Sequence, residues 1–219
     1  MWNFFVNIVN YLYFGLRLLK RWTGASGDEE TFDQWMNAVS EEDFLNFLAQ
    51  IFLISAIPTF FLLQKWSANY GRYSAEAWFS QYLLNSRFAW FIQEAPSLVA
   101  PMLALYWYGE QLNLSRFLAF AMFAGHYFQR TMIYPFLMSG GKKSPPHIVG
   151  AAFIFCATNG YMQAFYHVQY APFADDHCRS LVSQAGFIIF LTGMVINIHS
   201  DSILRNLRKA GEKGYKQRC

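Results

Sequence analysis

Charged residues are scarce in this sequence. Only 14% of its 219 residues are Asp, Glu, Lys or Arg, whereas a soluble domain carries about 25%. Hydrophobic residues make up 54% of the chain and aromatic residues 20%. This balance excludes an ordinary soluble domain. It is typical of a membrane protein, in which aromatic rings settle at the membrane interfaces.

Cysteine is also rare, and its three positions have neither disulfide nor metal-ligand spacing. Cys156 lies in an apolar run, Cys178 follows an acidic pair and Cys219 is the last residue, so we expect three unpaired thiols. The five histidines are too scattered for the paired histidine boxes of membrane di-iron enzymes, and no metal site is predicted. The chain also lacks a dinucleotide-binding glycine motif after a strand, a serine-hydrolase elbow and any nucleic-acid-binding module.

The sequence instead contains long apolar runs. Five of them can cross roughly 30 Å of hydrocarbon as helices of about 20 residues. They cover approximately residues 44–64, 84–107, 117–138, 148–171 and 180–199. We therefore predict an all-α fold, a polytopic transmembrane helical bundle with about five spanning helices.

The first 43 residues differ from the rest. A helix over residues 1–22 would carry a polar stripe of Asn3, Asn7, Asn10, Arg17 and Arg21, and apolar residues largely cover its other side. This pattern favours an amphipathic helix that lies in the membrane interface rather than one that crosses it. A hydrophilic acidic stretch follows, over residues 28–43. We therefore divide the chain into an N-terminal segment, 1–43, and a membrane domain, 44–219.

The distribution of Lys and Arg predicts an orientation. Three segments fall on one side of the membrane: the tail after Asp201 and the loops that contain Lys65 and Lys142. They hold six, two and two basic residues, ten in all, against Arg116 and Arg179 on the other side. The positive-inside rule then places the basic C-terminal tail in the cytoplasm. The basic residues of the N-terminal helix fall on the opposite side, in conflict with the rule.

Two of the apolar runs carry polar residues at membrane depth. The second contains Gln93 and Glu94, and the third contains His126, Tyr127 and Arg130. A charge at this depth costs roughly 2.5–3.5 kcal/mol on insertion scales and usually faces a cavity or a partner. Because the two runs carry opposite charges, we predict a polar pocket inside the bundle.

Helical spacing extends this pocket to the other runs, since residues three or four apart share a face. The stripes are Tyr127, Arg130 and Tyr134 in the third run, Asn159, Gln163 and His167 in the fourth, and Asn197, Asp201, Arg205 and Arg208 from the fifth into the tail. Four polar faces would enclose a site that opens toward the cytoplasm.

Each polar element also has a purely structural interpretation. Glu94 could neutralise Arg130 or Arg87 as an ion pair. Tyr127 and Tyr134 could be ordinary packing aromatics. The basic tail could be a topology signal that binds anionic headgroups.

Five strings of the sequence carry a family resemblance. They are FAWFIQEAPSLVAP (88–101), HYFQRTMIYPFLMSGGK (126–142), CATNGYMQAFY (156–166), YAPFADD (170–176) and GMVINIHSDSILRNLRKAGEKGYK (193–216). Together they resemble the steroid 5-alpha-reductase family, and most closely its type 1 members. The resemblance implies a multi-pass enzyme of the endoplasmic reticulum membrane, recovered in microsomes, that reduces the C4–C5 double bond of 3-oxo-Δ4-steroids with NADPH.

The resemblance also implies catalytic residues. The family's Gln-Glu pair falls on Gln93 and Glu94, and its His-Tyr pair falls on His126 and Tyr127. Glu94 and Tyr127 would hold the steroid 3-keto oxygen, and Gln93 would orient them. Reduction of an enone puts negative charge on that oxygen, and preorganised donors stabilise the charge. Glu94 would then carry a proton or share one with Tyr127.

For the cofactor, the resemblance implies contacts to NADPH from six residues. They are Arg130, Tyr134, Asn197, Asp201, Arg208 and Tyr215. A basic rim suits a phosphorylated ribose, because a guanidinium binds phosphate in bidentate fashion.

The sequence departs from the family pattern near its C-terminus. Family members continue after Gly-Tyr-Lys with a segment of the type IPxGGLFxYVxxxNxxGExxEW, whereas this sequence ends at Cys219, and Ala210 stands where a proline is usual. The missing positions help to enclose NADPH, so we expect weak cofactor binding and slow turnover. Two alternatives follow: an enoyl-thioester or polyprenol reductase of the same family, and an inactive form that modulates a full-length partner.

Overall fold

The computed structural model describes residues 40–65, 80–138 and 142–206. The chain divides into two compact units, residues 1–56 and 57–219. The described residues form helices, with one isolated β-bridge between Leu84 and Ser144. The all-α prediction is therefore confirmed for the described part of the chain. The predicted amphipathic helix over residues 1–22 lies outside it.

Helix α3 (Glu41–Lys65) begins with a capping interaction. The Ser40 hydroxyl accepts a hydrogen bond from the Asp43 backbone N–H and donates one to the Asp43 carboxylate. The acidic first turn and Lys65 in the last turn complement the helix dipole. Leu53 and Ile54 on this helix are 74% and 68% exposed, which suits contact with lipid.

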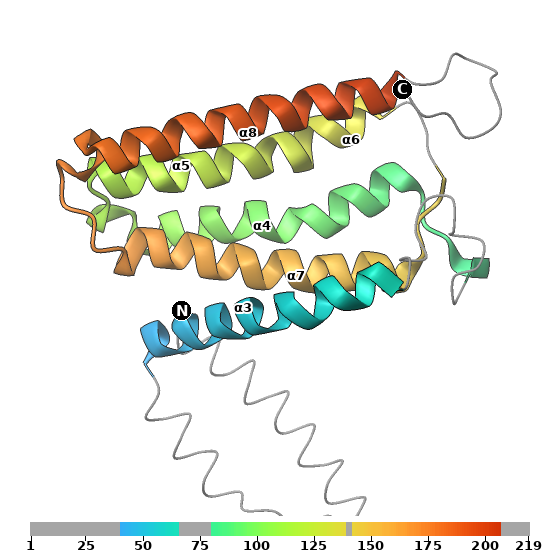
Figure 1. Cartoon of the computed structure of the whole chain (residues 1–219), viewed down its shortest axis with the longest axis horizontal. Helices are drawn as coiled ribbons and strands as arrows, with labels where there is room; N and C mark the ends of the chain where they lie inside the picture. The colour runs from blue at the N-terminus through green and yellow to red at the C-terminus, as the bar shows by residue number, and fades with distance from the viewer. Residues whose placement is uncertain (1–39, 66–79, 139–141, 207–219) are drawn as a thin grey trace, which may run out of the picture. The chain divides into compact units, whose positions relative to one another are not determined.

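The second unit is built around two closely packed helices, α4 (Ser86–Tyr108) and α7 (Pro146–Phe165), which lie side by side (Figure 1). The Ser97 hydroxyl on α4 donates a hydrogen bond to the Cys156 carbonyl on α7 at 2.7 Å. One turn further along α7, a Cβ placed on Gly160 would lie 2.8 Å from the Ser97 Cα. The absence of a side chain at residue 160 therefore lets the two backbones approach.

The next helical segment changes its winding in the middle. It consists of α5 (Leu114–Phe128), a π-helical turn η4 (Gln129–Ile133) and the short α6 (Tyr134–Leu137). A second π-helical turn, η5 (Tyr166–Tyr170), ends the segment that begins with α7. A π turn inserts one extra residue and often marks a functional site. Here, η4 contains Arg130.

Helix α8 (Leu181–Arg205) is apolar over most of its 25 residues. Ile188 and Ile189 are 63% and 71% exposed, and Asp201 is the one buried residue of this helix. Large exposed apolar surfaces of this kind are expected where lipid, rather than water, covers the protein.

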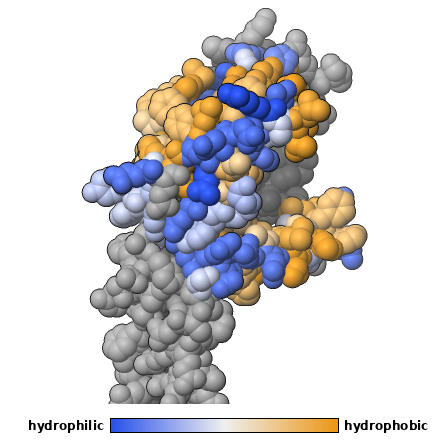
Figure 2. Space-filling view, turned by 90° about the vertical axis from the view of Figure 1, so that its left-hand side faces the viewer, coloured by the Kyte–Doolittle hydropathy of each residue, from blue (hydrophilic) through white to orange (hydrophobic). Residues whose placement is uncertain are grey.

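Two sets of contacts define the ends of the second unit. At one end, the Arg87 side chain on α4 donates to the Met138 carbonyl after α6. At the other end, the Asn113 side chain before α5 donates to the Phe173 carbonyl, and the Ser115 hydroxyl donates to the Asp175 carbonyl. Figure 2 looks onto this second end, where hydrophilic residues gather between hydrophobic flanks.

The predicted spans agree with the helices except in one respect. Four helical segments are long and apolar enough to cross a membrane: Glu41–Lys65, Ser86–Tyr108, Pro146–Tyr170 and Leu181–Arg205. The predicted third span, 117–138, is helical as well but is not among these four. His126, Gln129 and Arg130 lower the hydropathy of that segment. Five spans were expected. The described residues hold four candidate spans, and the fifth predicted stretch is a helical segment that is more polar than these four.

Candidate active site

Arg130 on η4 forms ion pairs with carboxylates on two other helices. Its Nη1 lies 2.9 Å from an Asp201 carboxylate oxygen on α8, and its Nη2 lies 3.6 Å from Glu94 Oε1 on α4. Each of the three side chains is only 12% exposed. Opposite charges from separate helices therefore meet inside the bundle, as the sequence predicted.

Aromatic rings complete the surroundings of this guanidinium. The Arg130 Cζ lies 4.5 Å from the centre of the Trp90 ring and 4.8 Å from that of Tyr134. The two rings are themselves 4.9 Å apart. Cation–π contacts of this kind are strongest where water is excluded, and they fix the plane of the guanidinium between its two carboxylate partners.

Glu94 lies between α5 and α7 and is held on both of its oxygens. Oε1 faces Arg130, and Oε2 lies 3.7 Å from the Cys156 thiol on α7. The Gln93 side chain also interacts with the Glu94 carboxylate. The role of Gln93 in orienting Glu94 stays a prediction.

Tyr127 on α5 lies close enough to Glu94 for an electrostatic interaction. Its hydroxyl oxygen accepts a hydrogen bond from the Asn159 amide on α7 at 3.3 Å and also interacts with the Ser97 side chain. The His126 ring packs edge-on against the Tyr127 ring, with their centres 5.3 Å apart. The predicted Glu94–Tyr127 pair is therefore brought together from two helices.

The predicted cofactor residues are only partly described. Tyr134 is buried at 8% exposure, and Asn197 lies one helical turn before Asp201 on α8. The side-chain amide oxygen of Asn197, Oδ1, is buried and accepts no hydrogen bond from the described residues. The Arg205 guanidinium lies 5.9 Å from the centre of the Tyr134 ring. Arg208 and Tyr215 lie outside the described residues.

The structure decides between the two ion pairs considered for Glu94. Arg130, not Arg87, is its partner, because Arg87 turns to the Met138 carbonyl. The predicted stripe on α7 divides in the same way. Asn159 reaches the Glu94–Tyr127 pair, whereas His167 lies in the π turn η5 and stacks with Phe173 at the opposite end of the unit.

Three members of the site were not identified as such from the sequence. They are Trp90, Ser97 and Cys156, all of which contact a predicted residue. Trp90 lies four residues before Glu94, a spacing that places both on one helical face and could have indicated its role. Cys156 lies three residues before Asn159, but an isolated thiol in an apolar run carries no comparable signal.

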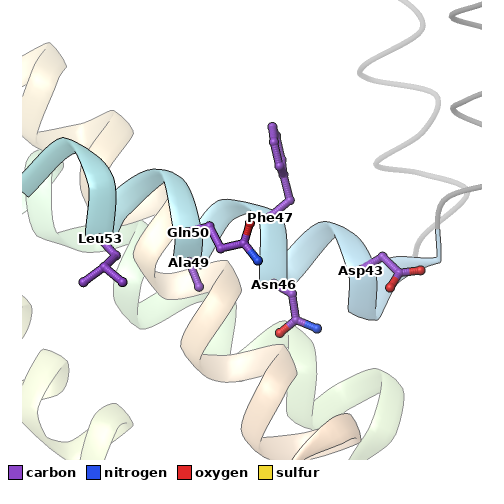
Figure 3. A pocket seen from close by; sticks show the side chains of 6 residues that line it. All are labelled: Asp43, Asn46, Phe47, Ala49, Gln50 and Leu53. Atoms are coloured by element: carbon purple, nitrogen blue, oxygen red, sulfur yellow. The ribbon is translucent and has the colours of Figure 1, made fainter.

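A hollow of about 540 Å³ lies beside α3. Its lining consists of Asp43, Asn46, Phe47, Ala49, Gln50 and Leu53, and all six side chains come from α3 (Figure 3). None of the predicted site residues is among them, so the candidate active site remains the cluster around Arg130, Glu94 and Tyr127.

Comparison with known proteins gives one consistent answer. A family model described as 3-oxo-5-alpha-steroid 4-dehydrogenase matches residues 142–217. The chain is 43% identical over 182 residues to 3-oxo-5-alpha-steroid 4-dehydrogenase 1 of Bos taurus, an alignment that covers 81% of this chain and 70% of that protein. The enzyme of the same name from Homo sapiens is 40% identical over 183 residues, 81% of this chain and 69% of that protein. The one from Mus musculus is 44% identical over 163 residues, 74% of this chain and 63% of that protein.

Proposed function

Because the chain belongs to the 3-oxo-5-alpha-steroid 4-dehydrogenase family, we propose that it reduces the C4–C5 double bond of 3-oxo-Δ4-steroids with NADPH. We place this activity in the membrane of the endoplasmic reticulum. The observation that carries the proposal is the convergence of Glu94, Tyr127 and Arg130, from α4, α5 and η4, in a part of the bundle where water is largely excluded.

The reduction requires hydrogen-bond donors at one oxygen of the substrate. As the double bond is reduced, negative charge develops on the 3-keto oxygen of the steroid. A donor that is already in place stabilises this charge more than it stabilises the neutral ketone, and it is worth about 10²–10³ in kcat. Tyr127 supplies a hydroxyl proton, and Glu94 supplies a second proton when its carboxyl is protonated.

Arg130 lies at different distances from its two carboxylate partners. The distance to Asp201 is 2.9 Å, whereas the distance to Glu94 is 3.6 Å. Asp201 is therefore the main counter-ion of the guanidinium. Glu94 is held less tightly and can carry the proton that a donor to the ketone requires.

The residues toward the end of α8 fit a phosphorylated dinucleotide. The buried side-chain amide oxygen of Asn197 lacks a donor among the described residues, and Arg205 adds a positive charge beside Tyr134. Arg130, Tyr134, Asn197 and Asp201 would hold NADPH, together with Arg208 and Tyr215. The bound cofactor would supply the hydride, while the protein supplies placement and electrostatics.

The proposal is tested with microsomes that contain the whole chain, supplied with NADPH and labelled testosterone. We expect a 5α-reduced product from the unsubstituted chain. We expect Glu94→Gln and Tyr127→Phe each to lower kcat by about 100-fold. Glu110→Gln and Tyr106→Phe are matched controls, because both side chains are exposed away from the cluster, and they should leave the rate unchanged.

The same membranes distinguish the other candidates. Reduction of an enoyl-thioester in preference to testosterone would favour the second reductase class. Absence of any product, combined with altered activity of a co-expressed full-length relative, would favour a modulating role and contradict the proposal.

A further inference from the structure

One face of α7 touches both members of the proposed donor pair. Cys156 and Asn159 are three residues apart and therefore share this face. The Cys156 thiol lies 3.7 Å from Glu94 Oε2, and the Asn159 amide donates to the Tyr127 oxygen at 3.3 Å. Glu94 belongs to α4 and Tyr127 to α5, so α7 is the element that contacts both.

This face is held firmly against α4. Ser97 is completely buried, and its hydroxyl donates to the carbonyl of Cys156 itself. Gly160 adjoins Asn159, and the approach of its backbone to Ser97 leaves no room for a side chain. The spacing between Glu94 and the α7 face is thus set by backbone contacts, which vary less than side-chain contacts.

The direction of the Asn159 hydrogen bond matters for the chemistry. A tyrosine hydroxyl has one proton to donate and lone pairs that accept. Because the Tyr127 oxygen accepts a hydrogen bond from the Asn159 amide, the Tyr127 proton can be donated to Ser97 Oγ, whose own proton goes to the Cys156 carbonyl, and to a ketone when one is bound. On the Glu94 side, the thiol and Arg130 occupy one oxygen each, so the plane of the carboxyl group is defined.

We propose that Asn159 and Cys156 are positioning residues: Asn159 directs the Tyr127 proton toward the steroid ketone, and Cys156 fixes the carboxyl group of Glu94. Neither residue need touch the substrate. This inference rests on the proposed function, since it assumes that the ketone is the acceptor of the Tyr127 proton.

A double-mutant cycle in the whole chain tests the role of Asn159. Asn159→Leu keeps the approximate size of the side chain and removes its donor. We expect it to lower kcat for testosterone by about 10-fold with a smaller change in KM, and to have no further effect in a Tyr127→Phe background. Thr158→Val is the matched control, because the Thr158 hydroxyl bonds only to the Ile154 carbonyl of its own helix among the described contacts.

The corresponding cycle for Cys156 uses Glu94→Gln as the second change. Cys156→Ala should lower kcat in the unsubstituted background only, and Cys156→Ser, which keeps a donor, should restore part of the loss. Equal losses with Glu94 intact and replaced would mean that Cys156 acts through packing alone and would contradict its part of the proposal.

A binding measurement gives a readout that does not depend on turnover. Testosterone labelled with ¹³C at its ketone carbon is bound to the detergent-solubilised chain, and the carbon signal is recorded by NMR. Hydrogen bonding to the oxygen moves this signal downfield. We expect Asn159→Leu and Tyr127→Phe each to reduce the downfield shift, and their combination to reduce it no further than Tyr127→Phe alone.

The outcomes separate this inference from the proposed function. If the unsubstituted chain neither reduces nor binds the labelled steroid, the proposed function is wrong and the inference falls with it. If it does either, and Asn159→Leu acts equally with Tyr127 present or replaced, or has no effect, only the positioning role is contradicted.

Discussion

At the scale of single residues, Arg130 is the centre of the charged contacts between the described helices. Its charge lies among apolar helices, where an unpaired charge is expensive. Asp201, Glu94 and two aromatic faces compensate this cost. Removing one partner of such a group leaves the others without compensation, and this usually costs more than the group contributes to stability.

Replacement of Arg130 by Met should therefore destabilise the protein strongly. The loss leaves Asp201 buried without its counter-ion, and breaking a buried pair in this way costs about 3–5 kcal/mol. Thermal unfolding of the detergent-solubilised chain measures the change. The combined Arg130→Met and Asp201→Leu variant should recover part of the lost stability, because it removes the uncompensated charge as well. A double variant no more stable than Arg130→Met would contradict this account.

At the scale of elements, the apolar runs predicted most of the helices. The predicted stretch 84–107 became α4 (Ser86–Tyr108), and the stretch 148–171 became α7 with η5, Pro146–Tyr170. Hydropathy and polar punctuation set these boundaries, and both can be read from local sequence. The polar residues were equally informative, since the opposite charges of the second and third runs were expected to meet, and Glu94 and Arg130 do so.

Two features of the elements could not be predicted in this way. The π turns η4 and η5 depend on backbone hydrogen bonds that skip one extra residue, and no residue type specifies them. The contribution of Cys156 depends on the register of α7 against α4. That register follows from the close approach at Gly160, a contact between segments about 60 residues apart that local patterns do not encode.

The close approach of α4 and α7 gives a prediction at this scale. Gly160→Ala would place a Cβ 2.8 Å from the Ser97 Cα, closer than real Cβ atoms come. We expect a loss of about 1–3 kcal/mol in the free energy of unfolding, since the two backbones must move apart.

Gly150→Ala is the matched control on the same helix, because nothing lies within 4 Å of a Cβ at that position. It should be neutral or stabilising by up to about 1 kcal/mol, as alanine favours helices over glycine. Equal effects of the two substitutions on thermal unfolding would show that the backbone contact is unimportant.

At the scale of the whole second unit, the helix ends form two groups. The start of α4 lies with the end of α6, through Arg87 and Met138, and the start of α5 lies with the segment after η5, through Asn113 and Phe173. From the positive-inside rule we expect the first group, with Lys142 and Lys143, to lie on the cytoplasmic side.

Glycosylation of inserted acceptor sequences tests this orientation. A polar loop carrying an Asn-x-Thr acceptor, inserted between Ala174 and Asp175, should be glycosylated in microsomes. The same loop inserted between Lys142 and Lys143 should remain unmodified. Gel mobility before and after treatment with a glycosidase distinguishes the two results, and the reverse pattern would invert the proposed topology.

The attachment of α8 has a mechanical consequence. Acyl chains can contact its apolar flanks about as well as neighbouring protein can. The attachment of this 25-residue helix to the bundle is therefore concentrated near its last turn, where Asp201 pairs with Arg130. A helix that is held mainly at one end can move at its other end. Asp201→Asn would then loosen the docking of an entire helix, an effect far larger than the loss of a single charge suggests.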